Sequence, residues 1–210
     1  MKQVSRLLSL LVLPVAFVIL MGSACDGGNN APPRAWERGA FQPMPENTQS
    51  YSLPGGVSED SLFGYEEDTD SLGSDTPLYL VVTNSNSGDT KVTFPAGLLF
   101  NPVNAVDYEY MMLVKEFSFT AKGGGTTTAI LPTYGCNSDS LSVPDADGQY
   151  SIGDKEWDKE TQELFTLIAS KPIQSDSAKE LVQDALDEIT GPDFPDGLTD
   201  ATRTALQQLP

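Results

Sequence analysis

The hydrophobic residues of this chain change their spacing partway along the sequence. Between residues 77 and 153, short runs of β-branched and aromatic residues alternate with clusters of Gly, Pro, Asn and Asp, a pattern typical of short strands joined by turns. From residue 154 onward, apolar residues recur every three or four positions, as they do on one face of an amphipathic helix. Such a chain needs a fold in which sheets and helices share a core.

The expected strands are short and uncharged or nearly so. They cover residues 78–84, 91–94, 98–100, 108–114, 117–121, 126–132 and 150–152. Residues 85–89 form a turn cluster, so we expect 91–94 to return beside 78–84. Likewise, Gly123-Gly124-Gly125 is expected to be a hairpin turn that leads into the strand at 126–132. Short strands with frequent turns predict an antiparallel β-sandwich of immunoglobulin-like or related type.

Three helices are expected in the C-terminal quarter of the chain. The first apolar stripe begins at Trp157 and continues through Thr161, Leu164, Phe165 and Ile168. Ser175 and Thr199 are suited to cap the next two helices. Because each helix has one apolar face, the helices must pack against something, and the sandwich is the nearest candidate. The predicted fold class is therefore mainly β with C-terminal helices, an antiparallel immunoglobulin-like β-sandwich packed with two or three α-helices.

The N-terminus carries a targeting signal. Lys2 and Arg6 give a basic start, residues 7–20 form a nearly unbroken apolar run, and the small residues 22–24 lead to Cys25. This order is typical of a secretory signal that ends at a cysteine. Two alternatives stay open. One is a transmembrane anchor, although the apolar run is short for a helix that needs about 20 residues to cross a bilayer. The other is an ordinary secretory signal that leaves Cys25 unmodified.

The segment around Cys25 resembles the lipobox of bacterial lipoproteins, in which signal peptidase II cuts just before a cysteine that carries acyl chains. The likeness rests on Ser23, Ala24 and Cys25, whereas Gly22 stands where lipoboxes usually have leucine. It implies that residues 1–24 are a lipoprotein signal peptide and that Cys25 carries acyl chains such as palmitate. The protein would then be lipid-anchored in a cell membrane, on the periplasmic or extracellular side. Two or three chains give a stable anchor, since each buried methylene contributes about 0.8 kcal/mol.

The region after Cys25 has a different composition from the rest. Residues 25–76 contain many Gly and Pro residues, then a run of acidic residues, with apolar residues scattered at no regular period. We therefore expect residues 25–76 to be a flexible acidic tether. The folded domain is expected to begin at residue 77, with the β-sandwich at 77–153 and a helical layer of the same domain at 154–210.

The charge of the chain limits its partners. The sequence has 12 Lys and Arg against 30 Asp and Glu, a formal charge of −18. Loss of residues 1–24 would leave 10 basic against 30 acidic residues, a charge near −20. This argues strongly against nucleic-acid binding, which needs a basic surface. An envelope protein or a cationic ligand is compatible with it.

The chain lacks the residue type that many enzymes use as a general base, and its cysteines are few. The chain has no histidine, which removes the Ser-His-Asp and Cys-His arrangements and the commonest zinc ligand. It has two cysteines, so acylation of Cys25 would leave Cys136 without a partner for an intramolecular disulfide. Cys136 is expected to be a small buried hydrophobe.

One short motif suggests a metal. Asp145 and Asp147 are followed by Gly148, and Asp154 lies seven residues beyond Asp147. Carboxylates around a tight turn suit Ca²⁺, and an EF-hand-like register would put these three residues at positions 3, 5 and 12. Position 1 would then be Val143, which cannot coordinate. The alternative is a solvated Asp-Gly turn between strands. No other cofactor is expected.

The function indicated by these features is a non-catalytic binding or structural interaction domain on a lipid-anchored cell-envelope protein. Residues 92–97, 134–136 and 198–199 give the chain a loose resemblance to small β-sandwich domains of bacterial surface proteins. The alternative is an envelope hydrolase that uses carboxylates, with Ca²⁺ assisting. A cleft with two carboxylates in unequal environments would favour the enzyme, and an exposed apolar patch would favour the interaction domain.

Overall fold

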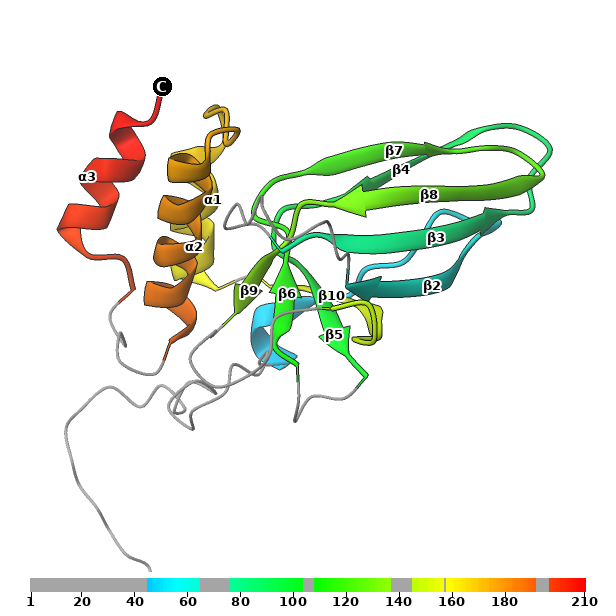
Figure 1. Ribbon diagram of the computed structural model, residues 1–210, viewed down its shortest axis with the longest axis horizontal. Coiled ribbons are helices and arrows are strands. Elements are labelled where there is room, and N and C mark those ends of the chain that lie inside the picture. The colour runs from blue at the N-terminus through cyan, green and yellow to red at the C-terminus, as the bar shows by residue number, and fades with distance from the viewer. Residues whose placement is uncertain (1–44, 65–75, 104–107, 137–144, 157, 192–196) are drawn as a thin grey trace, which may run out of the picture. The chain divides into compact units, whose positions relative to one another are not determined.

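The structure, a computed structural model, describes residues 45–64, 76–103, 108–136, 145–156, 158–191 and 197–210. Within these ranges the chain forms ten β-strands, three α-helices and a short 3-10 helix at Pro45–Asn47. The strands form three antiparallel sheets, and the helices follow them in the sequence (Figure 1). The predicted class, mainly β with C-terminal helices, is confirmed, whereas the immunoglobulin-like assignment stays a prediction.

Three sheets contain these strands, and we name them the central, outer and small sheets. The central sheet has the order β1-β10-β5-β6-β9, with bounds Thr48–Gln49, Tyr150–Glu156, Leu98–Pro102, Tyr110–Met112 and Tyr134–Cys136. The outer sheet has the order β2-β3-β8, with bounds Val57–Gly64, Leu78–Asn84 and Gly125–Leu131. The small sheet pairs β4 with β7, with bounds Thr90–Phe94 and Phe117–Ala121.

The central sheet is covered on both faces, which explains the dense apolar runs of its strands. Leu98, Leu99 and Phe100 follow one another in β5, and all three are fully buried. Successive side chains of a strand point to opposite faces. Leu98 and Phe100 therefore enter one hydrophobic core, and Leu99 enters a second. Met111 and Met112 of β6 divide between the two cores in the same way.

The first core, which we call the sandwich core, receives side chains from all three sheets. Leu80 of the outer sheet, Phe94 of the small sheet and Phe100 of the central sheet are all fully buried in it. The rings of Phe94 and Phe100 meet edge to face, with centroids 6.1 Å apart. The outer and small sheets thus pack on one face of the central sheet, and together they form the sandwich.

The second core, which we call the helix core, lies between the other face of the central sheet and the three helices. The helices are α1 (Lys159–Ile168), α2 (Asp176–Thr190) and α3 (Asp200–Gln208). Leu99, Cys136, Leu164, Val182 and Leu206 are among its buried members. Helices α2 and α3 begin where their predicted caps lie: Ser175 caps α2 and Thr199 caps α3, each by accepting an N–H from the third residue along.

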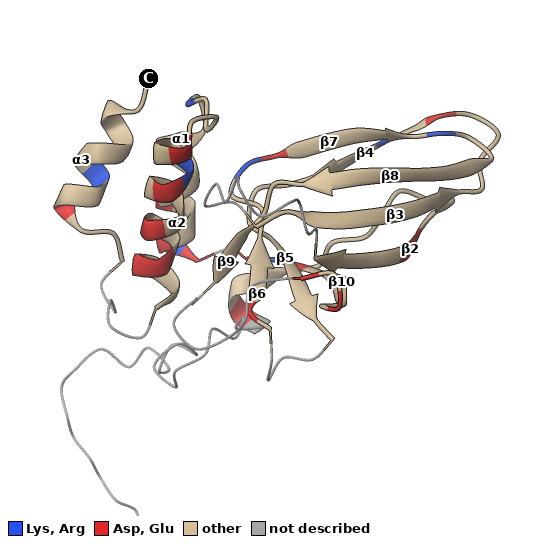
Figure 2. Cartoon of the chain, viewed as in Figure 1, with Lys and Arg blue, Asp and Glu red and all other residues tan. Residues whose placement is uncertain are grey.

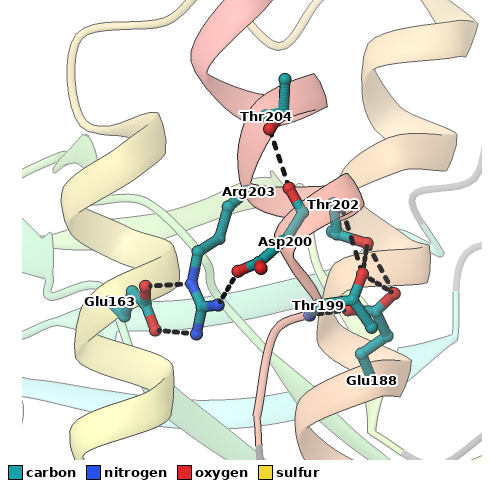
Figure 3. Close-up of polar contacts among 7 residues, drawn as sticks. All are labelled: Glu163, Glu188, Thr199, Asp200, Thr202, Arg203 and Thr204. Atoms are coloured by element: carbon teal, nitrogen blue, oxygen red, sulfur yellow. Dashed lines mark hydrogen bonds and ion pairs between the residues drawn. The ribbon is translucent and has the colours of Figure 1, made fainter.

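Polar contacts join the helices to one another (Figure 3). Arg203 of α3 forms a forked ion pair with Glu163 of α1, with Nε 2.6 Å from Oε1 and the terminal nitrogen 3.3 Å from Oε2. Glu188 of α2 accepts the backbone N–H of Thr199 at 2.8 Å and the hydroxyl of Thr202 at 2.5 Å. Several of the acidic side chains are therefore used to fix how the helices pack.

The expected boundary of the tether is wrong. Residues 57–64 form β2, which pairs with β3 along its length, and Val57 and Leu62 enter the sandwich core. These two residues are five apart, so a regular strand would point them to opposite faces. The register shifts between Glu59 and Ser61, which marks a β-bulge with one extra residue, and both apolar side chains then face inward. The bulge hides the strand pattern in the sequence.

The expected hairpins are also wrong in their pairing. The strand at 91–94 does not return beside 78–84, because β4 pairs with β7 while β3 pairs with β2 and β8. The turn at 123–125 likewise links β7 to a strand of a different sheet. Both turns therefore connect strands of different sheets, and we call such a connection an arch. The buried side chain of Asn84 explains the two arches, because its amide donates to the carbonyl oxygens of Gly88 at 3.1 Å and Ala121 at 2.9 Å. Asn84 thereby holds both connections at one end of the sandwich.

Candidate functional site

The predicted lipidation residue, Cys25, lies outside the described residues, so its acylation stays a prediction. In the part of the chain that the structure describes, no helix is both long and apolar enough to cross a membrane. Cys136 was expected to be a small buried hydrophobe, and this is confirmed, since it is 1% exposed and belongs to the helix core. Burial, followed by four nearby carboxylates, raises the pKa of its thiol well above the usual value.

The predicted metal turn is held together by its own first carboxylate. Asp145 Oδ1 accepts the backbone N–H groups of Asp147 at 3.0 Å and Gly148 at 2.9 Å. It also accepts the hydroxyl of Tyr108 at 2.9 Å. The Tyr108 hydrogen bond is the main reason why the pKa of Asp145 is lowered. This is an Asx turn, as the alternative interpretation of the motif described.

The third predicted ligand does not complete a metal site. Asp154 is an exposed residue of β10, between Ile152 and Lys155, where the register of that strand shifts. Among the residues that the structure describes, no group of three or more Cys, Asp and Glu side chains is placed to hold a metal. The structure thus keeps Asp145 and Asp147 in one turn and does not bring Asp154 to them. Calcium binding by Asp145, Asp147 and Asp154 stays a prediction.

A cleft of about 380 Å³ lies beside this turn, between β2 and the segment that leads into β10. Its lining residues are Glu59, Asp60, Ser61, Leu62, Phe63, Ala146, Gln149 and Tyr150. The walls are joined at one end, because Gly64 donates its N–H to the Gly148 carbonyl oxygen at 3.1 Å and Phe63 forms a bridge with Gln149. The cleft therefore has walls fixed by backbone hydrogen bonds.

Two carboxylates line the cleft, and the bulge of β2 sends them in different directions. Glu59 is half-buried and accepts the backbone N–H of Ile152, in β10, at 3.1 Å. Burial raises the pKa of Glu59, and this hydrogen bond offsets part of the rise. Asp60 instead accepts the hydroxyl of Thr83 at 2.5 Å. Thr83 belongs to the opposite face of the outer sheet from Glu59, so the two carboxylates do not converge.

The side of the outer sheet that faces away from the sandwich core is a second feature, and we call it the outer face. Its members are Ser58, Asp60, Ser61, Phe63, Tyr79, Val81, Thr83, Thr126, Thr128 and Ile130. Phe63, Tyr79 and Ile130 stand in register across the three strands. The rings of Phe63 and Tyr79 lie 5.0 Å apart, and Ile130 is 47% exposed.

The outer face is poor in charge, although the chain is strongly acidic. Strands β3 and β8 contain no charged residue, and Figure 2 shows both in a single neutral colour. Asp60 is the charged residue among the described members of this face. Phe63 belongs to the outer face and also lines the cleft. The outer face and the cleft therefore form one continuous surface, which is the candidate binding surface.

Sequence reasoning missed the residues of β2 that build this surface. Glu59, Asp60 and Phe63 lie within the range expected to be a flexible tether, because acidic neighbours and the bulge break the alternation that marks a strand. The signal in the sequence is the apolar pair Leu62 and Phe63 just before Gly64, because glycine commonly bounds a strand. Tyr79 and Ile130 were placed in strands correctly, but their pairing with Phe63 depends on a register that sequence alone does not give.

Comparisons with protein families, with curated proteins and with solved structures found no match to this chain. The class of this protein is therefore described from the fold and the exposed surface of the chain alone. The fold is a small β-sandwich with a helical layer on one side and an exposed, nearly uncharged sheet face on the other.

Proposed function

We propose that this chain is a lipid-anchored cell-envelope protein whose folded domain is a non-catalytic binding module. Anchoring is supported by the order of basic residues, apolar run, small residues and Cys25 at the N-terminus. The observation that carries the binding role is the outer face, where Phe63, Tyr79 and Ile130 align in a row with little charge around them. Apolar faces of this kind commonly mark sites of interaction between proteins.

The charge of the protein narrows the partner. A cationic ligand would be attracted to the acidic chain as a whole, but the outer face offers it Asp60 alone among the described residues. Apolar and hydroxyl side chains suit the surface of another protein, which they contact by packing and by hydrogen bonds. The proposed partner is therefore an envelope protein, and a cationic ligand is the second choice. Nucleic acid is not proposed, because the chain has 30 acidic against 12 basic residues.

The anchor is tested by replacing Cys25 with serine and separating the cell membranes from the soluble fraction. We expect wild-type protein in the membrane fraction, with a mature mass that includes acyl chains. The Cys25→Ser variant should leave the membrane and lose that added mass. If the variant stays in the membrane and has the same mature mass as wild type, the lipoprotein assignment is wrong.

The candidate binding surface is tested by crosslinking in intact envelopes, followed by recovery of the protein and identification of attached partners. Ile130→Glu places a charge in the centre of the outer face and should abolish the specific crosslink. Val103→Glu is the matched control, because Val103 is also an exposed large hydrophobic residue, 69% exposed, but lies outside the outer face. Equal crosslinking by both variants would contradict the proposed surface.

One observation favours the alternative, a carboxylate-dependent envelope hydrolase with Ca²⁺ assisting. Glu59 lies in a cleft and has a raised pKa, as a general acid requires. Glycoside hydrolysis also needs a second carboxylate facing the same bond, and Asp60 is directed to the other side of the sheet. The Glu59→Gln variant separates the two functions. It should keep the crosslinked partner if the domain is a binding module, and a hydrolase would lose turnover of envelope polysaccharide.

A further inference from the structure

A carboxylate is buried at the point where the helices meet the central sheet. Glu109 directly precedes β6, and its side chain is 1% exposed. Its Oε2 atom has no hydrogen-bond partner within the described structure. An ionised carboxylate without partners is expensive to bury. The position therefore suits the neutral, protonated form of Glu109.

The carboxyl group of Glu109 lies against the edge strand of the central sheet. Gly135 is the middle residue of β9, and a Cβ atom added there would lie 2.4 Å from Glu109 Oε1. Any other residue at this position would thus displace the carboxyl group. Glycine makes room for a buried acid beside the backbone of an edge strand.

Helix α2 holds the backbone of the same glycine through Gln183. The side-chain oxygen of Gln183 accepts the Gly135 N–H at 3.1 Å, and the side-chain nitrogen donates to the Gly135 carbonyl oxygen at 2.9 Å. The same nitrogen donates to Asp187 Oδ1 at 2.9 Å. Gln183 thereby pairs with the edge strand as another strand would, and we call these contacts the α2–β9 clamp.

The groups that face Glu109 come from three elements. Asp187 comes from α2, Cys136 from β9 and Tyr150 from β10, whose hydroxyl donates to the Glu109 backbone carbonyl oxygen at 3.2 Å. None of these groups is a cation, and no described Lys or Arg forms an ion pair with Glu109. Burial, and then the charge of Asp187, raises the pKa of Glu109 from 4.5 to about 8.

We propose that the α2–β9 clamp is a proton-controlled latch, closed while Glu109 carries a proton and released more readily as the proton is lost. When the clamp opens, Glu109 meets water and regains its ordinary acidity. Closing therefore takes up a proton at any pH between the ordinary value of 4.5 and the raised value of about 8. Closing becomes less favourable as the pH rises through this window, and the effect levels off above it. Acidic conditions hold the helices on the sheet, and neutral to alkaline conditions loosen them.

The test is amide hydrogen exchange of the full-length protein, measured by mass spectrometry at pH 5.5 and pH 7.5 and corrected for the intrinsic exchange rate. Linkage allows up to about a tenfold loss of protection per pH unit. We expect protection of α2 and β9 in the wild type to fall by up to roughly a hundredfold over these two units. Glu109→Gln, which has the same shape and cannot ionise, should lose this pH dependence.

Peptides from β3 serve as the internal control, because this strand belongs to the sandwich core. A latch predicts that protection of β3 changes far less with pH than protection of α2. An equal fall in both would show that Glu109 is linked to unfolding of the whole domain, and it would overturn the latch. The same pH dependence in the wild type and in Glu109→Gln would also overturn it.

Asp187→Asn is a second variant, in case Glu109→Gln does not fold. It removes the neighbouring charge and keeps Glu109. The window of pH dependence should then become narrower, with its upper limit moved to lower pH. An unchanged upper limit would show that Asp187 does not act on Glu109, and it would contradict the proposed arrangement of the latch.

Discussion

Replacing Gly135 with alanine should destabilise the protein, because the new methyl group would meet a buried carboxyl group. The added Cβ would lie 2.4 Å from Oε1 and 2.5 Å from Cδ of Glu109, well inside ordinary contact distances of about 3.5 Å. Glu109 is 1% exposed and cannot simply swing into solvent. Overpacking of this kind costs about 1–3 kcal/mol. For a chain of this size, that corresponds to a fall of roughly 2–12 °C in melting temperature.

A double-mutant cycle identifies the cause. In a Glu109→Ala background the space beside Gly135 is free, so Gly135→Ala should cost little. The two variants should therefore couple by at least about 1 kcal/mol in urea unfolding of the mature chain. Gly55→Ala is the matched control, since nothing lies within 4 Å of its added Cβ, and it should change stability by less than about 0.5 kcal/mol. If Gly135→Ala costs the same in both backgrounds, the carboxyl group of Glu109 does not lie against Gly135.

Three further predictions follow from the two cores and the turn. Cys136 should react with a thiol reagent at pH 8 only after denaturation, and rapid reaction of the native protein would contradict its burial and raised pKa. Leu99→Ala and Phe100→Ala should each lower the free energy of unfolding by about 2–5 kcal/mol, since the side chains on both faces of β5 are buried. A free energy of unfolding equal to that of wild type, measured by urea titration, would refute this packing. If Asp145, Asp147 and Asp154 bind Ca²⁺, millimolar Ca²⁺ should raise the melting temperature of wild type and not that of Asp147→Ala. Equal shifts would contradict the calcium site and leave a turn whose Asp145 carboxylate accepts three hydrogen bonds.

The sequence predicted those strands and helices that are determined by residues close to them in the sequence. Residues 78–84 and 117–121 match β3 and β7, because uncharged β-branched and aromatic runs between turns are sufficient to mark a strand. Ser175 and Thr199 predicted where two helices begin, because a cap acts on the residues next to it. Strand β2 was missed, since its bulge breaks the alternation that marks a strand.

Features that depend on contacts between residues distant in the sequence could not be predicted in the same way. The turn at 85–89 is short enough for a hairpin, and nothing nearby shows that Asn84 would hold an arch between two sheets. Glu109 lies beside a strand, and its burial depends on Gly135 and on α2, which are distant in the sequence. The motif at Asp145 was visible, but its carboxylate accepts hydrogen bonds within the turn, and no group of three carboxylates placed to hold a metal forms among the described residues.

Strand β1 gives the fold a defined response to mechanical force. It pairs with β10 at two positions, Thr48 with Glu156 and Gln49 with Lys155. On the proposed lipid anchoring, force from the membrane enters the described part of the domain on its N-terminal side, where this strand lies. Two pairs at the edge of a sheet separate at low load, whereas β2 is held to β3 by seven. Neither residue of β1 belongs to the sandwich core or the helix core, so its detachment would remove no buried member of either core.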